Sequence, residues 1–185
     1  MTIIKIIQNI DWSILFFIQN HMVNPINNKI MIFITSLGNI GLIWIVLSII
    51  FILSKKHRNL GIMIIIGLIL ELIIGNGILK NIFQRPRPCW IDHSVHLLIP
   101  VPKDYSFPSA HAFSCFISGT IIAKYNKRWG IFALVLAALI SFSRLYLFVH
   151  FPSDVLVGAI LGVIFGNVIY NIFNRLIQNK KRKLQ

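Results

Sequence analysis

The stretch LGIMIIIGLILELIIGNGIL, residues 60–79, decides the fold class of this chain, and Glu71 is its single charged residue. About 20 mostly apolar residues in a helix span the hydrocarbon core of a bilayer. Because the backbone finds no water there, a segment of this kind crosses the membrane with its hydrogen bonds satisfied within a helix. Residues 60–79 are therefore predicted to form a transmembrane helix.

The rest of the chain has the same character. Of its 185 residues, 56% are hydrophobic and 12% are charged, about half the charged share of a typical soluble domain. Four more segments meet or approach the length and apolarity of a span: 37–53, 107–123, 129–149 and 155–173. The sequence predicts an all-α, polytopic membrane helix bundle that forms a single domain over residues 1–185.

The N-terminal stretch IIKIIQNIDWSILFFIQNHM, residues 3–22, is more ambiguous because Asp11 and other polar residues interrupt its apolar run. It forms either a sixth span or an amphipathic helix that lies in the membrane interface. We favour a sixth span, so the expected bundle has six transmembrane helices.

The net charge of +13 lies mostly in short clusters between apolar segments, at 54–59, 124–128 and 180–185. Loops that flank membrane helices on the cytoplasmic side have this pattern, and it argues against a nucleic-acid-binding surface. Residues 80–106 and the connection around His150 are then expected to face the outside. This outer side also carries basic residues, against the charge rule, which suggests that they have a function there.

Three stretches on the predicted outer side hold the candidate functional residues: KNIFQRPRP at 80–88, FPSAHAF at 107–113 and SRLYLFVHFPSD at 143–154. In one pocket their cations would favour a tetrahedral oxyanion, since guanidinium groups bind such anions with two parallel hydrogen bonds. A helix that begins near Ser109 adds backbone N–H groups, which also bind phosphate. The predicted cations of this phosphate site are Lys80, Arg87 and Arg144.

Two histidines complete the predicted site. Asp154 follows His150 by four residues, so its carboxylate can bind one ring nitrogen and leave the other as a nucleophile. His111 can then give a proton to the leaving oxygen, a role that suits a group titrating near neutral pH. A metal site built from His111, His150 and Asp154 is the alternative, but the nearby cations would repel a divalent ion.

These stretches resemble the signature of the type 2 phosphatidic acid phosphatase (PAP2) superfamily, which is related in its catalytic core to vanadium haloperoxidases. The family signature is KxxxxxxRP, then PSGH, then SRxxxxxHxxxD. The first and third parts match residues 80–88 and 143–154 in type and spacing, and the second corresponds to PSAH at 108–111. The resemblance covers the core, roughly residues 60–173.

The resemblance implies a role for each matching residue. His150 would be the nucleophile that forms a phosphohistidine, Asp154 would orient it, and His111 would protonate the leaving group. The implied phosphate-binding residues are Lys80, Arg87, Ser109, Ala110 and Arg144. Arg85 stands at an unspecified position of the first part of the signature, and we expect it to contact the phosphate or the headgroup. Ala110 stands where the family has glycine, and it keeps its backbone N–H for phosphate if its φ is negative. The enzymes of this family need no metal or other cofactor.

The resemblance also implies a substrate, a lipid phosphate or diphosphate within the bilayer. An outward-facing site in the plasma membrane favours undecaprenyl diphosphate, which would be converted to undecaprenyl phosphate. A glycerolipid phosphate, such as phosphatidylglycerophosphate or phosphatidate, is the alternative substrate. A transporter of anionic lipid or phosphate is the alternative outside enzymes, although such proteins favour charges at the membrane midplane.

The sequence leaves several questions open. The oligomeric state has no signal in it. Glu71 lies inside a predicted span, where a carboxyl group is costly and often functional, and it either pairs with a cation or is neutral and hydrogen-bonded. The other residues with an open role lie in the outer loop: Trp90, Asp92, His93 and His96.

Overall fold

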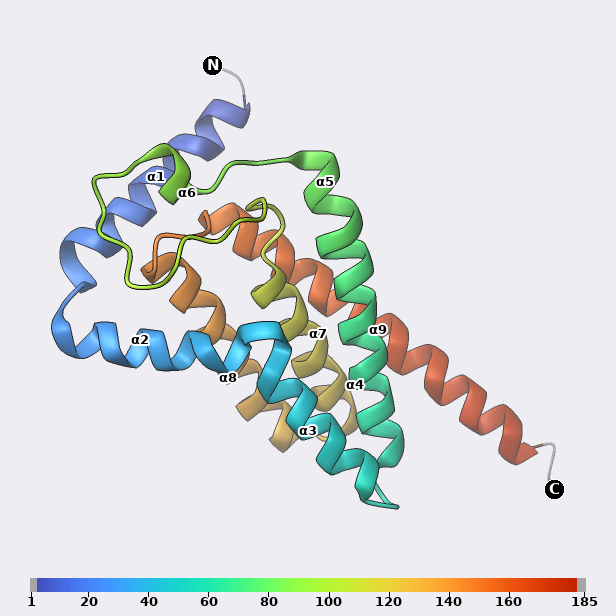
Figure 1. Cartoon of the computed structure of the whole chain (residues 1–185). Helices are drawn as coiled ribbons and strands as arrows, with labels where there is room; N and C mark the ends of the chain where they lie inside the picture. The colour runs from blue at the N-terminus through green and yellow to red at the C-terminus, as the bar shows by residue number, and fades with distance from the viewer. Residues whose placement is uncertain (1–2, 183–185) are drawn as a thin grey trace.

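The computed structural model describes residues 3–182, and every regular element in that range is a helix (Figure 1). The elements, in chain order, are α1 (Ile3–Met22), α2 (Pro25–Gly38), the short 3₁₀ turn η1 (Asn39–Gly41), α3 (Leu42–Leu53), α4 (Arg58–Glu71), the π-helical segment η2 (Leu72–Leu79), α5 (Lys80–Phe83), α6 (Pro88–Ile91), α7 (Ala110–Tyr125), α8 (Lys127–Tyr146) and α9 (Pro152–Arg182).

Four helical segments of the described chain are long and apolar enough to cross a membrane: Pro25–Leu53, Arg58–Ile91, Lys127–Tyr146 and Pro152–Asn179. The prediction of an all-helical, multi-pass membrane protein is thereby confirmed. Neither α1 nor α7, which has 16 residues, is among the four. The count of six spans stays a prediction.

The expected span over residues 37–53 is broken at its start. Ile40 and Gly41 have positive φ angles of 55° and 71°, a conformation that glycine adopts without strain and β-branched residues avoid. The break turns the chain sharply, so that α2 and α3 run in different directions (Figure 1). It also leaves the Ile40 side chain 95% exposed beside the cavity described below.

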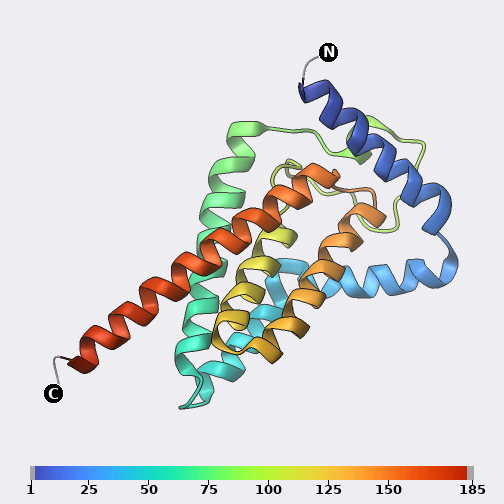
Figure 2. The same cartoon turned by 180° about the vertical axis from the view of Figure 1, so that it is seen from behind.

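Helix α7 is the centre of the bundle. It packs against α4, α8 and α9, and Figures 1 and 2 show it enclosed by them from both sides. Helix α9 approaches it closely through glycines four residues apart, a spacing that brings membrane helices into backbone contact. A Cβ atom at Gly162 would lie 2.7 Å from Phe116 Cβ and 2.8 Å from the Phe113 carbonyl oxygen.

The elements α4, η2 and α5 follow one another without a gap and form the second long helix. This helix changes its winding before it reaches the predicted site: after Glu71 it becomes π-helical over η2, and from Lys80 it continues as α5. The i→i+5 hydrogen bonding of a π-helix brings residues five apart to one face, and Asn76 Nδ2 accordingly donates to Glu71 Oε1 at 3.1 Å. Segments of this kind often occur at functional sites.

The two basic loops between helices lie together at one end of the bundle. His57 Nδ1 and the Tyr125 hydroxyl are 2.8 Å apart, and the Trp129 ring contacts both His57 and Phe51. The loops at 54–59 and 124–128 therefore share one side, as the sequence predicted.

The three motif stretches meet at the opposite end. The Ser106 N–H donates to the Arg85 carbonyl at 2.9 Å, and the Ser109 N–H donates to the Asp154 carbonyl at 3.1 Å. These bonds tie the loop between α5 and α7 to the end of the second long helix and to the start of α9. Residues that are distant in the sequence are thus assembled around one site.

Helix α1 lies along the turn that joins α8 to α9. Leu15 and Ile18 are buried in a second apolar core with residues 146–149 and Phe151 of that turn. Gln19 Nε2 donates to the Tyr146 carbonyl at 2.8 Å. The N-terminal helix therefore packs against the turn between α8 and α9 and stabilises this end of the molecule.

Candidate active site

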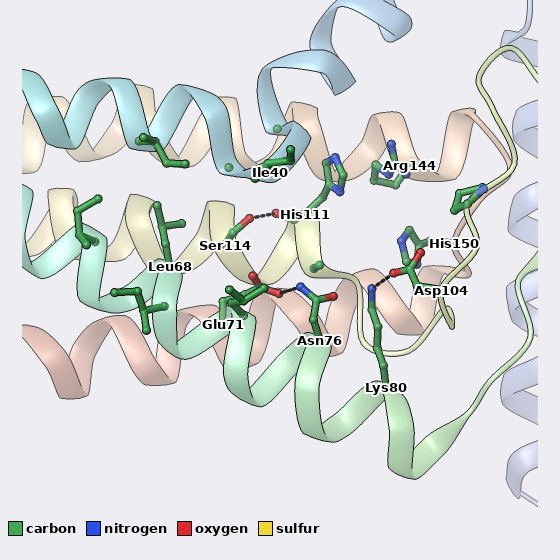
Figure 3. Close-up of a pocket in the computed structure, with 18 of the residues that line it drawn as sticks. Ile40, Leu68, Glu71, Asn76, Lys80, Asp104, His111, Ser114, Arg144 and His150 are labelled. Atoms are coloured by element: carbon green, nitrogen blue, oxygen red, sulfur yellow. Dashed lines mark hydrogen bonds and ion pairs between the residues drawn. The ribbon is translucent and has the colours of Figure 1, made fainter.

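A cavity of about 590 Å³ opens at the motif end between η1, the second long helix and the start of α7. One part of it is apolar, and the other part gathers ionisable side chains (Figure 3). Of the residues that the sequence predicted for the site, six line this cavity: Lys80, Arg87, Ala110, His111, Arg144 and His150.

His150 lies in the turn between α8 and α9 and is 1% exposed. Its Nε2 accepts a hydrogen bond from Arg87 Nη1 at 3.0 Å. On the other side of the ring, Nδ1 is 3.3 Å from Ser106 Oγ and 3.7 Å from Asp154 Oδ2. Asp154 is itself held by the Ser106 hydroxyl and by the Phe151 N–H, which lies 2.9 Å from Oδ2. Ser106 therefore links the ring to the carboxylate.

The surroundings of His150 keep its ring neutral. Burial, together with the positive charges of Arg87 and Arg144, holds the pKa of His150 well below its ordinary value. In the neutral ring one nitrogen donates and the other accepts. With Nδ1–H facing Ser106 and Asp154, Nε2 carries the lone pair that accepts the Arg87 hydrogen bond. This neutral ring is the form of histidine that can attack an electrophile.

Lys80 and Arg87 share one carboxylate that the sequence analysis did not identify. Asp104 forms an ion pair with Lys80 Nζ and another with Arg87 Nη2, the latter at 2.9 Å. Burial raises the pKa of Asp104, but the hydrogen bond from Lys80 and the charges of Arg87 and Lys80 outweigh it and lower the pKa to about 2. The Asp104 side chain is 53% exposed. Lys80 and Arg87 are therefore paired with a charged carboxylate that comes from the loop and is only half-buried.

Arg144 has no such carboxylate. It is 5% exposed, and its Nη1 donates to Thr35 Oγ1 at 2.6 Å. Among the described residues, no hydrogen-bond partner reaches its Nε and no acidic side chain forms an ion pair with it. A buried charge without a compensating anion is costly, and Arg144 lines the cavity, so an anion there could supply the missing charge.

The start of α7 contributes the backbone of the site. Ser109 caps the helix through its side chain, which accepts from the Ala112 N–H at 3.5 Å. Ala110 is the first helical residue and is not among the residues with positive φ. The alanine in place of the family glycine therefore keeps the backbone conformation in which its N–H is available, and the first turn presents N–H groups that have no partner within the helix.

His111 follows in the same turn and projects into the cavity near Ile40 (Figure 3). Its Nε2 is 3.3 Å from Asn39 Oδ1 in η1. Gly38 makes room for the ring, because a Cβ atom there would lie 2.8 Å from His111 Cδ2 and 2.6 Å from Ile140 Cγ2. The broken segment between α2 and α3 thus supports one side of the site.

Arg85, predicted from the sequence as a headgroup contact, lies behind Asp154 and is absent from the cavity lining. Its guanidinium is in ion pairs with Asp154 and with Asp11 of α1. The chain turns just before Arg85, at Gln84, whose φ is 44°. The lining also lacks the four loop residues whose role was open: Trp90, Asp92, His93 and His96.

Sequence reasoning missed four polar residues of the site. Asp104 and Ser106 lie just before the second motif, and Asn39 and Thr35 come from the segment before the matching core. Glu71 lines the cavity and is hydrogen-bonded to Asn76 (Figure 3), one of the two alternatives considered for it. The scarcity of acidic residues was the one signal that could have drawn attention to Asp104, because the chain has only five of them.

The arrangement can bind a tetrahedral oxyanion and attack it. Lys80, Arg87 and Arg144 surround one region with positive charge, and the first turn of α7 adds backbone donors. His150 and His111 line the same cavity. Nε2 of the neutral His150 ring can act as a nucleophile, and His111 is the second group that can exchange a proton there. Preorganised charge of this kind stabilises the transition state of phosphoryl transfer.

Comparison with known proteins gives the same picture. Residues 56–178 match the family model described as the PAP2 superfamily. The chain is 31% identical to an undecaprenyl-diphosphatase of Sulfolobus acidocaldarius over 84% of its own length and 75% of the relative's. It is 30% identical to the undecaprenyl-diphosphatase BcrC of Bacillus subtilis, over 83% of the chain and 78% of that protein.

A solved structure agrees with these sequences. The crystal structure of a transmembrane PAP2-type phosphatidylglycerolphosphate phosphatase from Bacillus subtilis superposes with a TM-score of 0.77 at 27% identity, over 91% of this chain and 87% of that one. The match of sequence, fold and motif geometry has one explanation: this chain belongs to the PAP2 superfamily and is a membrane lipid phosphatase.

Proposed function

We propose that this chain hydrolyses the phosphate or diphosphate group of a membrane lipid by direct attack of His150 on phosphorus. The observation that carries the proposal is the buried guanidinium of Arg144, which has no carboxylate partner among the described residues and lines the same cavity as His150. A phosphoryl group bound there gives Arg144 its missing anion and brings phosphorus to the nucleophile.

The reaction has two steps. His150 Nε2 attacks phosphorus, an N–P bond forms and the bond from phosphorus to the leaving oxygen breaks, while His111 gives that oxygen a proton. Water then attacks phosphorus, gives a proton to His111 and breaks the N–P bond, which releases inorganic phosphate and restores both histidines. The three cations balance the charge on the equatorial oxygens in each step.

Arg87 has two tasks in this scheme. Without substrate it donates to Nε2 of His150 at 3.0 Å, which fixes the ring and occupies the lone pair. When a phosphoryl group enters, its oxygens accept the hydrogen bonds of the guanidinium in place of Nε2, which is then free to attack. Charge-assisted hydrogen bonds to phosphate are strong enough to favour this exchange.

The cavity supports a lipid substrate. Beyond the charged end its wall is apolar and suits the first segment of a hydrocarbon chain; the residues concerned are Ile40, Ile45, Ile65, Leu68, Ile69 and Leu72. We propose undecaprenyl diphosphate, because both sequence relatives are undecaprenyl-diphosphatases. A glycerolipid phosphate is the second candidate, because the superposed structure is a phosphatidylglycerolphosphate phosphatase.

The proposed location is the plasma membrane, with the site on its outer side. The basic loops 54–59 and 124–128 lie at the end opposite to the cavity. Since basic loops favour the cytoplasm, the cavity end faces outward. Undecaprenyl phosphate would then be regenerated on the side where polymer synthesis releases its diphosphate.

The test is phosphate release by purified protein in detergent, with EDTA, from undecaprenyl diphosphate, phosphatidylglycerophosphate and phosphatidate side by side. A higher kcat/KM for the diphosphate supports the first candidate, and a higher value for either glycerolipid supports the second. Equal release from all three would contradict a selective pocket. Activity that EDTA removes would contradict attack by histidine without a metal.

Asp104 is expected to compete with the substrate for Lys80 and Arg87. Because its pKa is about 2, it is charged throughout the neutral range and must leave the cations when a phosphoryl group binds. The change Asp104→Asn should lower the inhibition constant of inorganic phosphate about fivefold, near 1 kcal/mol for a half-exposed ion pair. Inhibition curves for the two proteins measure this directly.

The control is Asp92→Asn on the same loop. Asp92 lies outside the cavity lining and accepts a hydrogen bond from the Ser94 N–H at 2.8 Å, so this change should leave phosphate inhibition unaltered. Weaker phosphate binding in Asp104→Asn would contradict competition and would mean that Asp104 holds the two cations in place for the substrate.

A further inference from the structure

A carboxylate from outside the family-matched region reaches the catalytic end of the molecule. Asp11 lies midway along α1, and its side chain is 3% exposed. Its Oδ2 accepts from Arg85 Nη2 at 2.7 Å and from Ser153 Oγ at 2.6 Å, and its Oδ1 accepts from the Ser153 N–H at 2.9 Å. The buried charge of Asp11 is therefore fully committed to two residues of the motif stretches.

Arg85 carries this contact to the carboxylate that orients His150. Its Nη1 donates to Asp154 Oδ1 and to Ser153 Oγ, the latter at 2.7 Å. One guanidinium thus bridges two buried carboxylates, Asp11 and Asp154. Since Arg presents its donors in a rigid planar fork, the position of one carboxylate constrains the position of the other.

Aromatic packing from the same helix fixes the bridge. The Arg85 guanidinium lies 4.2 Å from the centre of the Phe151 ring. Trp12, the neighbour of Asp11, packs edge-on against that ring at 5.1 Å between centres. Helix α1 therefore holds Arg85 by charge on one side and, through Phe151, by stacking on the other.

Asp11 also stabilises the start of α9. Ser153 is the second residue of that helix, and its N–H is one of the first-turn groups that a helix leaves without a partner of its own. A carboxylate there satisfies the N–H and interacts favourably with the helix dipole. Asp154 follows Ser153 in the chain, so the first turn of α9 and the orienting carboxylate share this anchor.

The position of Asp154 matters because of the distances around His150. Asp154 Oδ2 is 3.7 Å from His150 Nδ1, with Ser106 Oγ at 3.3 Å from the same nitrogen. The contact to Ser106 is near the limit of hydrogen bonding, and the distance to Asp154 is just beyond it. A small displacement of Asp154 therefore decides whether the ring keeps the tautomer in which Nε2 is the free nucleophile.

We propose that Asp11 is a positioning residue for catalysis, which acts through Arg85 and Ser153 to hold Asp154 against His150. The inference rests on the proposed function, because it concerns attack by His150. It makes the N-terminal helix, which lies before the matched residues 56–178, part of the catalytic apparatus. It also gives Arg85 a role in turnover and none in headgroup binding.

The test compares Asp11→Asn with Gln19→Ala. Both residues hold α1 against the same turn, but the Gln19 side chain, within residues 3–182, bonds only to the Tyr146 carbonyl and is not part of the carboxylate network. In Asp11→Asn we expect kcat to fall about 10- to 100-fold while KM stays within about twofold, as for a group that acts on the transition state alone. Gln19→Ala should retain kcat within about twofold.

Arg85→Lys keeps the positive charge and loses the fork, and it tests the same link from its other end. Its kcat should fall to a similar extent, and the double variant with Asp11→Asn should be no slower than the slower single variant, since residues of one network are not additive. Thermal unfolding in detergent is followed for each variant. If Asp11→Asn fails to fold, Arg85→Lys and Ser153→Ala decide by the same criterion.

Unchanged kcat in Asp11→Asn would overturn the inference, as would an equal loss in Gln19→Ala, which would reduce Asp11 to a docking contact. A raised KM with unchanged kcat in Arg85→Lys would also overturn it, in favour of a headgroup contact. Each of these results leaves His150-dependent phosphate release by the wild-type chain intact. Absence of that release would overturn the proposed function and, with it, this inference.

Discussion

Replacement of His150 by alanine is expected to abolish phosphate release, with a fall in kcat of about four orders of magnitude or more, as for other nucleophiles that form a covalent intermediate. The ring is buried, and its Nε2 has a single partner, Arg87. The loss should occur at every substrate concentration, because the cations that bind phosphate remain. Binding of inorganic phosphate, measured by calorimetry, should persist within about tenfold.

His111→Ala separates the two histidines. With a lipid phosphate this variant should also be slow, since no acid protonates the leaving oxygen. With p-nitrophenyl phosphate, whose leaving group needs no proton, the phosphoenzyme should still form and then accumulate because water lacks its base. An acid-labile, alkali-stable phosphate on His111→Ala, absent from His150→Ala, is the expected result. Accumulation on the His150 variant instead would reverse the two assignments.

Replacement of Arg144 by methionine is expected to lower activity and raise stability together. Loss of one preorganised charge at a transition state costs about 10²- to 10³-fold in kcat. The same side chain is buried with its Nε unpartnered, and methionine keeps most of its volume without the charge. Removal of a buried, uncompensated charge should therefore stabilise the fold by about 1 kcal/mol or more.

The two effects are measured on one preparation, as kcat/KM for phosphate release and as the midpoint of thermal unfolding in detergent. Arg58→Met is the matched control, since Arg58 is exposed at the opposite end of the bundle. It should change neither quantity appreciably. A fall in the unfolding midpoint of Arg144→Met would contradict the idea that the charge is retained for substrate at the expense of stability.

The sequence predicted the helical fold because long apolar runs have one structural solution in a bilayer. Residues 60–79 lie in a single long helix, as expected, and the motif stretches meet at one end. The left-handed conformation of Ile40 was not predictable, because the backbone there depends on contacts between η1 and α7, such as Asn39 with His111. Helix α1 was ambiguous for a physical reason: Asp11, which interrupts its apolar run, belongs to the polar network around Arg85.

The candidate site was predictable where its residues follow a fixed spacing. His150 lies just before α9 and Asp154 lies in the first turn of that helix, and their proximity follows from four residues of separation. Asp104 and Ser106 reach the site through a loop whose path is set by tertiary contacts, so local pattern contains no trace of them. In a chain of +13 net charge with five acidic residues, the rarity of carboxylates was the available clue. Three of the five, Asp11, Asp104 and Asp154, hold cations at this one end.

The π-helical segment before Lys80 has a consequence for how this chain can vary. Each residue of an α-helix turns the next by about 100°, whereas the i→i+5 bonding of the π-helical segment spreads each turn over more residues. If the same eight residues, 72–79, wound as regular α-helix, Lys80 would rotate about the helix axis relative to Glu71 and the phosphate site would lose a cation. The winding of this stretch is therefore under a constraint that hydropathy alone would never reveal.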